Sequence, residues 1–174
     1  MSEFKFPTEE VELPSKGLIY PEENPLSSGK VEVKYMTAKE EDILSNQSFI
    51  QKGVVLDKLL KSVIVNKDID INTLIVGDKN ALLIATRVLG YGKDYNVSVK
   101  GVDYTIDMTT LENKEIDESK FKRGENNFTF TTPSTGTILT YRLATGKIEK
   151  SIEKELIGLK KINKENSSEL TTRL

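Results

Sequence analysis

The segment from Leu13 to Leu26, LPSKGLIYPEENPL, restricts the fold more than any other part of the chain, because it contains three of the five prolines. Proline fixes its own φ, removes a backbone donor and biases the preceding residue towards extended conformations. Leu13, Tyr20 and Asn24 each precede a proline, and Gly17 can supply a turn. The segment therefore predicts an arm that forms neither a helix nor a regular strand.

The arm is too apolar to be an idle linker. Leu13, Leu18, Ile19 and Tyr20 all need cover from water. An extended, proline-stiffened segment with spaced apolar residues suits docking into a groove of a partner, at a reduced entropy cost. It can equally wrap around its own domain, and both alternatives bury Leu18 and Tyr20.

Helical signals dominate the next part of the chain. Residues 31–36 alternate apolar and polar side chains, which predicts a half-buried strand. Thr37 and Glu40 then have the spacing of a capping box, which predicts a short helix over residues 38–45. We expect a second short helix over residues 48–52, ended by Gly53.

Two longer amphipathic helices are expected before residue 93. The first has apolar residues at helical spacing on one face, namely Val55, Leu56, Leu59, Leu60, Val63 and Ile64. The second covers residues 79–89 after Asp78, which we interpret as an N-cap, and Gly90 and Gly92 end it. Its predicted buried stripe is Ala81, Leu82, Ala85, Val88 and Leu89.

Strand patterns replace helical patterns after residue 94. Residues 95–99 and 104–108 alternate around a turn at residues 100–103, and residues 128–131 and 138–143 do the same around Pro133 and Gly136. We expect the two hairpins to form one small antiparallel sheet. A last helix is predicted over residues 148–162, where Ile157 and Ile162 flank an apolar stripe and add more apolar surface than a small sheet covers.

The fold class expected from these patterns is α+β. It comprises an extended N-terminal arm over residues 1–30, a helical core with one strand over 31–93, an antiparallel β subdomain over 94–146, and a C-terminal helix region over 147–174. The pattern at residues 168–174 resembles the start of another helix, so we expect the natural chain to continue past Leu174.

Composition excludes several classes of site. The chain has no cysteine and no histidine, which removes thiolate and imidazole metal ligands, thiol nucleophiles and the commonest general base. The net charge of −2 shows no basic footprint for nucleic acid. No apolar run approaches the roughly 20 residues needed to span a membrane.

Fragments that imitate known motifs fail on spacing. Gly146 and Lys147 lack the upstream glycine of a phosphate-binding loop, because Tyr141 holds its place. Gly90 and Gly92 follow a helix, whereas a dinucleotide fingerprint opens one. The segment DIDIN at residues 68–72 begins like a calcium loop, but the sixth and twelfth positions are Thr73 and Lys79. Adjacent Glu40, Glu41 and Asp42 do not face one another on a helix. We expect no catalytic residue, cofactor or metal.

Four blocks in order resemble the base plate protein family of T-even-type contractile-tailed phages, whose members are baseplate hub subunits or hub assembly proteins. The blocks are LPSKGLIYP, EVKYMTAKEEDIL, LDKLLKSVIV and VGDKNALLIATRVLGYG. The resemblance runs from about residue 12 to 95, and more loosely through STGTILTYRLATGKIEK. Relatives often carry cysteine pairs in the first hairpin, as in a zinc ribbon, where this chain has KGVD at residues 100–103.

The resemblance implies a noncatalytic structural or assembly protein of a phage baseplate hub that binds other hub or tail proteins. It implies a location in the virion tail baseplate, or in the host cytoplasm during assembly, with oligomerisation in the baseplate as an option. The alternatives are a small metal- or nucleotide-dependent enzyme, an assembly chaperone absent from the virion, and a host-directed regulator. The expected partner-binding residues are Leu13, Pro14, Leu18, Ile19, Tyr20, Ile157 and Ile162.

Overall fold

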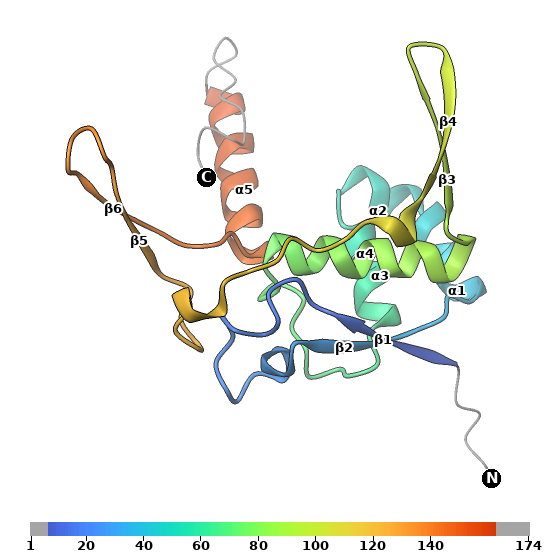
Figure 1. Ribbon diagram of the computed structural model, residues 1–174. Coiled ribbons are helices and arrows are strands. Elements are labelled where there is room, and N and C mark those ends of the chain that lie inside the picture. The colour runs from blue at the N-terminus through green and yellow to red at the C-terminus, as the bar shows by residue number, and fades with distance from the viewer. Residues whose placement is uncertain (1–6, 163–174) are drawn as a thin grey trace. The chain divides into compact units, whose positions relative to one another are not determined.

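A computed structural model describes residues 7–162 of the chain, as helices and three antiparallel strand pairs (Figure 1). The α+β class is confirmed. The chain divides into two compact units: unit 1 consists of Met1–Ile69 and Gly77–Glu125, and unit 2 of Asp70–Val76 and Asn126–Leu174. This division places the two expected hairpins in different units.

Unit 1 begins with a two-stranded sheet. β1 (Thr8–Glu12) pairs antiparallel with β2 (Lys30–Lys34), with Val11 opposite Val31 and Glu9 opposite Val33. Val31 and Val33 are buried, as their alternation predicted, and Val33 also bridges to Ile64. β1 was not predicted, because its sequence TEEVE carries a single apolar residue and lacks an alternating pattern.

Between these strands the proline-containing arm folds back on its own unit. Its turns carry hydrogen bonds from Lys16 N to Leu13 O and from Tyr20 N to Gly17 O, and a short 3₁₀ helix, η1 (Pro25–Ser28), ends at Gly29. All the large apolar side chains of the arm are buried: Leu13, Leu18, Ile19, Tyr20 and Leu26. The arm therefore wraps its own domain, which is one of the two alternatives that the sequence left open.

Two glycines make the close approach of the arm to η1 feasible. Gly17 and Gly29 both have φ of 74°. A Cβ on Gly17 would lie 2.4 Å from the carbonyl oxygen of Ser27, and a Cβ on Gly29 would lie 2.7 Å from that of Lys16. Both positions thus need glycine for conformation and for space.

Three short helices follow β2: α1 (Ala38–Ser45), α2 (Gln47–Gln51) and α3 (Val55–Val63). The capping box at Thr37 and Glu40 is present, as predicted. Leu59, Leu60 and Val63 form the buried face of α3. The expectation that Leu56 shares this face is wrong, because its side chain is 46% exposed.

The longest helix of unit 1 is α4 (Val76–Tyr91), whose first residue belongs to unit 2. It begins three residues earlier than predicted. Asp78 therefore lies in the first turn and is not an N-cap. It is fully buried, and its partners are residues of the arm.

After α4, β3 (Asp94–Val99) and β4 (Val102–Asp107) form a hairpin around Lys100 and Gly101 (Figure 1). Both turn residues have positive φ, at 53° and 79°, which is the geometry of a type I′ turn. η2 (Met108–Thr110) and η3 (Glu118–Lys120) complete the elements of unit 1.

Unit 2 contains the second hairpin and the C-terminal helix. β5 (Phe128–Thr131) pairs with β6 (Ile138–Tyr141), and α5 (Gly146–Ile162) follows. Segment Asp70–Val76 joins them through an Ile75–Thr145 bridge and a hydrogen bond from Gly146 N to Leu74 O. The expectation of one shared sheet is wrong, because β3–β4 and β5–β6 are separate two-stranded sheets.

Gly17→Ala should destabilise unit 1 by roughly 3 kcal/mol, because the methyl group adds a backbone clash to the cost of a positive φ. Gly101→Ala is the matched control: its φ is also positive, but nothing lies within 4 Å of the new Cβ, so roughly 1 kcal/mol is expected. Urea denaturation of both variants measures the difference. Equal losses would show that the arm does not need this close approach.

Candidate functional site

Asp78 joins the arm to α4. Its carboxylate accepts hydrogen bonds from Ser15 N (3.0 Å), Ser15 Oγ (2.7 Å) and Tyr20 OH (2.6 Å). The side chain is 0% exposed, so these bonds replace the water that a carboxylate needs. The arm is thereby fixed on both sides of its Gly17 turn, and the start of α4 is fixed with it.

The periodicity of α4 explains which of its faces meets the core. Asp78, Leu82 and Thr86 recur every four residues and are buried. Thr86 satisfies its hydroxyl by donating to Leu82 O at 2.7 Å. The neighbouring apolar stripe was predicted to be core, but apart from Leu82 its side chains are only half-buried: Ala81, Ala85, Val88 and Leu89.

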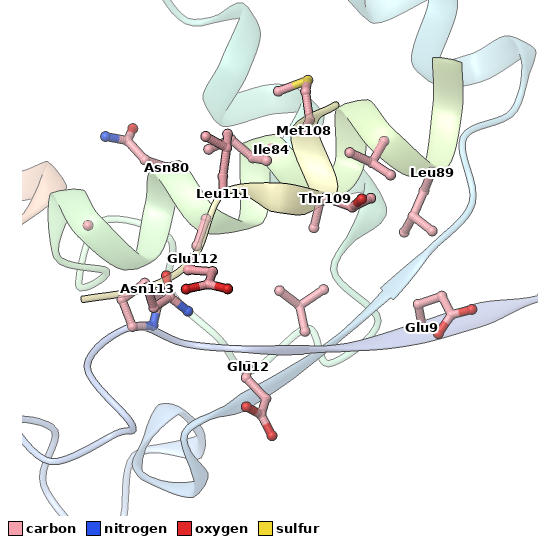
Figure 2. Close-up of a pocket in the computed structure, with 16 residues that line it drawn as sticks. Glu9, Glu12, Asn80, Ile84, Leu89, Met108, Thr109, Leu111, Glu112 and Asn113 are labelled. Carbon is pink, nitrogen blue, oxygen red and sulfur yellow. The ribbon is translucent and has the colours of Figure 1, made fainter. Parts of the chain in front are cut away.

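These half-buried side chains form the floor of a groove in unit 1, with a cavity volume of about 600 Å³. Figure 2 shows that its lining comes from three segments: β1 with the start of the arm, α4, and residues 108–113 after β4. Ile84, Met108 and Leu111 add apolar surface to the floor and walls. The groove is thus an open apolar trough beside β1.

Carboxylates border this groove. Glu9 and Glu12 come from β1, and Glu112 comes from the opposite wall (Figure 2). No lysine or arginine lines the groove, and none of the three carboxylates forms an ion pair within the described part of the chain. The groove is therefore apolar at its floor and negatively charged at its edge.

A smaller cavity of about 290 Å³ adjoins the groove and shares Glu12, Pro14 and Asn113 with it. The arm forms one side and residues 113–116 form the other. The two cavities therefore lie next to each other along the first turn of the arm, and the smaller one is also lined by Lys16 and Lys114.

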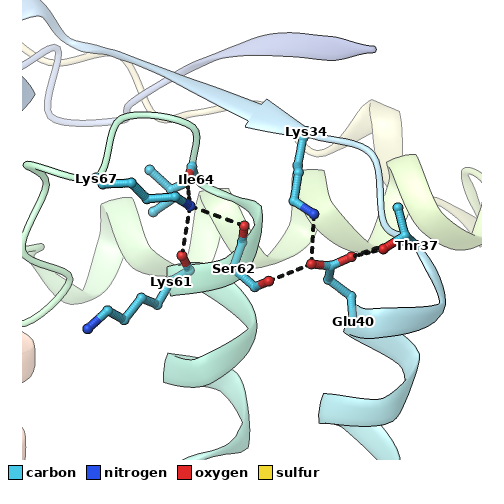
Figure 3. Close-up of polar contacts among 7 residues, drawn as sticks. All are labelled: Lys34, Thr37, Glu40, Lys61, Ser62, Ile64 and Lys67. Carbon is cyan, nitrogen blue, oxygen red and sulfur yellow. Dashed lines mark hydrogen bonds and ion pairs between the residues drawn. The ribbon is translucent and has the colours of Figure 1, made fainter. Parts of the chain in front are cut away.

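Glu40 is the centre of a second polar network in unit 1 (Figure 3). Its side chain is 0% exposed. Oε1 accepts from Lys34 Nζ (2.8 Å) and Ser62 Oγ, and Oε2 accepts from Thr37 N (2.9 Å) and Thr37 Oγ1 (2.6 Å). Burial by itself raises the pKa of Glu40, but the bonds from Lys34, Ser62 and Thr37 outweigh it and lower the pKa to about 2.

Lys67 lies near this network and covers the end of α3. Its Nζ donates to the carbonyl oxygens of Lys61, Ser62 and Ile64 (Figure 3). Burial, followed by the charge of Lys34, lowers the pKa of Lys67. The group has the residue types of an acid–base site, but Glu40 is closed to solvent and both its oxygens are already bonded. We interpret it as the junction that holds β2, α1 and α3 together.

The structure places the predicted partner-binding residues in three settings. Leu13, Leu18, Ile19 and Tyr20 are buried in unit 1, whereas Pro14 lines the groove. Ile157 is 50% exposed on α5. Ile162 ends α5, but its side chain lies outside the described residues, as does the segment 168–174. Partner binding by these residues stays a prediction.

The calcium-like segment is a locally bonded turn. Asp70 Oδ1 accepts from Asn72 N (3.0 Å) and Asn72 Nδ2 (2.7 Å), and Asn72 Oδ1 accepts from Lys150 Nζ (2.7 Å). Within residues 7–162 no cluster of three or more potential metal-ligating acidic, histidine or cysteine side chains occurs. The same residues include no helix with the length and apolarity required to cross a membrane.

Both hairpins carry an apolar face. In β3–β4 three cross-strand pairs share it: Tyr95–Ile106, Val97–Tyr104 and Val99–Val102. In β5–β6 it consists of the stacked pair Phe128–Tyr141, with ring centroids 5.4 Å apart, and the pair Phe130–Leu139. Most of these side chains are about half exposed, because each hairpin is a sheet of only two strands.

Sequence reasoning assigned the residues of the groove floor to the core, and it missed the edges of the groove. The stripe on α4 was recognised by its helical spacing. No sequence motif marks Glu9, Glu12 and Glu112. They come together at the groove only because β1 forms, and the sequence pattern did not predict β1. The signal available was indirect: Val31 and Val33 needed a partner strand, and TEEVE is the segment that supplies it.

Tyr20→Phe should destabilise the protein by about 1–2 kcal/mol, because it removes one donor from the buried Asp78 carboxylate. Tyr104→Phe is the control. It removes the same hydroxyl group, but from a side chain that is 51% exposed. Thermal denaturation compares the two. A Tyr20→Phe melting temperature equal to that of the control would show that Ser15 alone satisfies Asp78.

Glu40→Gln should destabilise the protein by about 1–3 kcal/mol at pH 7. The folded pKa of about 2 lies below the unfolded value of about 4.3, so Glu40 stabilises the fold above pH 4.3 and this contribution is lost as pH falls towards 2. The difference between wild type and variant should therefore shrink between pH 5 and pH 2.5. Glu23→Gln, at an exposed position, should follow wild type; a constant Glu40→Gln difference across this range would contradict the assignment.

Comparisons with known proteins assign no family. No family model matches the chain, and no significant match occurs to a curated protein or a solved structure.

Proposed function

We propose that this chain is a noncatalytic structural or assembly protein of a contractile-tail baseplate hub, and that it acts by binding other hub or tail proteins. The observation that carries the binding role is the groove of unit 1. It combines an apolar floor on α4, a volume of about 600 Å³ and a carboxylate edge. Exposed apolar surface of this kind marks interaction sites, including those that bind proteins.

The buried polar groups of unit 1 support binding rather than catalysis. Asp78 and Glu40 are its fully buried carboxylates, and both accept hydrogen bonds from neighbouring structural elements. A catalytic carboxylate needs a route to substrate, and these two have no exposed surface. The carboxylates that do meet solvent at the groove stand at its edge, where they select a partner by charge.

The baseplate setting is supported by the four ordered blocks of sequence resemblance. Three of them lie within unit 1 entirely, and the fourth supplies α4 and hence the groove floor. The location that follows is the virion tail baseplate, or the host cytoplasm during assembly. Oligomerisation within the baseplate is compatible with both.

Deletion of the gene from the encoding phage should leave filled heads but stall baseplate formation, as seen by electron microscopy of lysates. Wild-type protein supplied in trans should restore tails. Ala85→Glu, which puts a charged side chain into the groove, should not restore them. Leu56→Glu is the matched control, because Leu56 is exposed on α3 and does not line the groove.

Complete tails from the deletion phage would contradict the proposal, as would turnover of a substrate by the purified protein. Circular dichroism must show that Ala85→Glu folds as wild type does, so that a failure to complement reports on binding. Mass spectrometry of purified particles then separates a resident hub subunit from an assembly factor that leaves before completion.

A further inference from the structure

The outer edge of β1 carries backbone groups that no neighbouring strand uses. Two hydrogen bonds fix which residues face β2: Leu13 N donates to Gly29 O at 2.8 Å, and Tyr35 N donates to Pro7 O at 3.1 Å. In an antiparallel ladder alternate residues direct both backbone groups to the same neighbour. Residues 7, 9, 11 and 13 therefore face β2, and Thr8, Glu10 and Glu12 face away from it.

The outward groups of this edge are unpaired. Within the described residues, the backbone groups of Thr8, Glu10 and Glu12 have no hydrogen-bond partner outside the β1–β2 pair. All three residues are exposed. An exposed edge of this kind is a template for another strand, and native proteins usually cover or blunt it.

This free edge borders the groove. Glu9, Val11 and Glu12 of β1 line the groove, and its floor is the apolar stripe of α4. A strand added to β1 would direct every second side chain to the face that Val11 occupies, towards the apolar floor. The intervening side chains would lie on the opposite, exposed face.

Charge selects the occupant further. Glu9, Glu12 and Glu112 stand at the groove without an ion pair in the described part of the chain, and no basic residue lines it. A segment with lysine or arginine beside its apolar residues would meet opposite charge, and an acidic segment would be repelled.

We propose that β1 takes an extended segment of a partner protein as a third strand, in which apolar residues alternate and lysine or arginine residues flank them. This inference rests on the proposed function, because it names the chemistry of the partner that the groove binds. Backbone hydrogen bonds to the edge of β1 supply affinity. Apolar contacts with the α4 floor select the apolar side chains of the segment, and the carboxylates select its basic side chains.

The test uses a library of random 12-residue peptides displayed on filamentous phage and selected on the full chain. Enriched peptides should have apolar residues at every second position and a positive net charge. Synthetic fluorescent copies are then titrated by fluorescence anisotropy. An absence of enrichment overturns the proposal, and so does enrichment with apolar residues three and four apart, which would indicate a helical occupant.

Glu10 offers a matched pair of variants. Its N–H points away from β2, so Glu10→Pro should keep the β1–β2 ladder and remove an outward donor. Peptide affinity should fall at least about tenfold for Glu10→Pro, and change less than about twofold for Glu10→Ala, which keeps the N–H. Equal affinities for the two variants overturn the strand mode.

Where Glu10→Pro fails to fold, the peptide provides the same test. Methylation of alternate backbone nitrogens on an enriched peptide should abolish binding in one register of methylation and spare it in the other. Binding that survives both registers overturns the proposal.

The charge contribution is tested with a triple Gln variant at Glu9, Glu12 and Glu112. Affinity should fall about fivefold or more at low salt, and the salt dependence of binding should weaken. A triple Gln variant at the exposed residues Glu22, Glu23 and Glu153 is the control with the same net charge. Equal effects of the two triples would show nonspecific attraction and overturn the recognition argument.

Two further outcomes separate this inference from the proposed function. If Glu10→Pro restores tails in the deletion phage as well as wild type does, the strand mode fails and the hub role stands. If the purified chain forms a dimer by sedimentation that Glu10→Pro dissolves, the occupant is a second copy, and the partner proposed here is wrong.

Discussion

The buried carboxylate of Asp78 is the interaction on which the rest of unit 1 depends. It binds the arm through Ser15 and Tyr20 and lies in the first turn of α4. The three prolines keep the arm from forming an α-helix or a strand, so outside the short helix η1 the arm has no regular backbone hydrogen-bond ladder of its own. The Asp78 carboxylate in α4 instead holds the arm in place, by accepting hydrogen bonds from Ser15 and Tyr20. Because β1 leads directly into the arm, the same contact also sets where β1 lies against α4.

The groove follows from this arrangement and differs from the other apolar surfaces of the chain. The hairpins β3–β4 and β5–β6 also expose apolar faces, but each is only two-stranded; the alternate face of β3–β4 is polar, and that of β5–β6 carries three threonines and the exposed Ile138. Two-stranded hairpins are marginal in water without cover, so their faces are explained by the need for cross-strand pairs. Within residues 7–162, the groove of unit 1 combines apolar surface, carboxylates without an ion pair and a strand edge that no other strand pairs with.

Local patterns predicted most elements, and tertiary constraints explain the misses. The capping box, the hairpin turns and the helical stripe of α3 follow from spacing within a few residues. They are observed with two differences: Leu56 is exposed, and the first turn is Lys100 and Gly101 alone, where residues 100–103 were predicted. Asp78 was misread as an N-cap because its partners lie 58 and 63 residues away in sequence. β1 was missed because a charged edge strand has no alternation to detect. The groove edge depends on β1, so it could not be predicted either.

The distribution of carboxylates separates structure from recognition in unit 1. Asp78 and Glu40 are buried, and the bonds that they accept come from the arm, β2 and α3, so their charge is used to join elements. Glu9, Glu12 and Glu112 are exposed and form no ion pair in the described part of the chain, and Glu9 accepts a long hydrogen bond of 3.4 Å from the Tyr35 hydroxyl. Three carboxylates without an ion pair add little to the stability of the fold, and no lysine or arginine lines the groove to offset their charge. Recognition of a basic, apolar segment is the function that makes this arrangement useful.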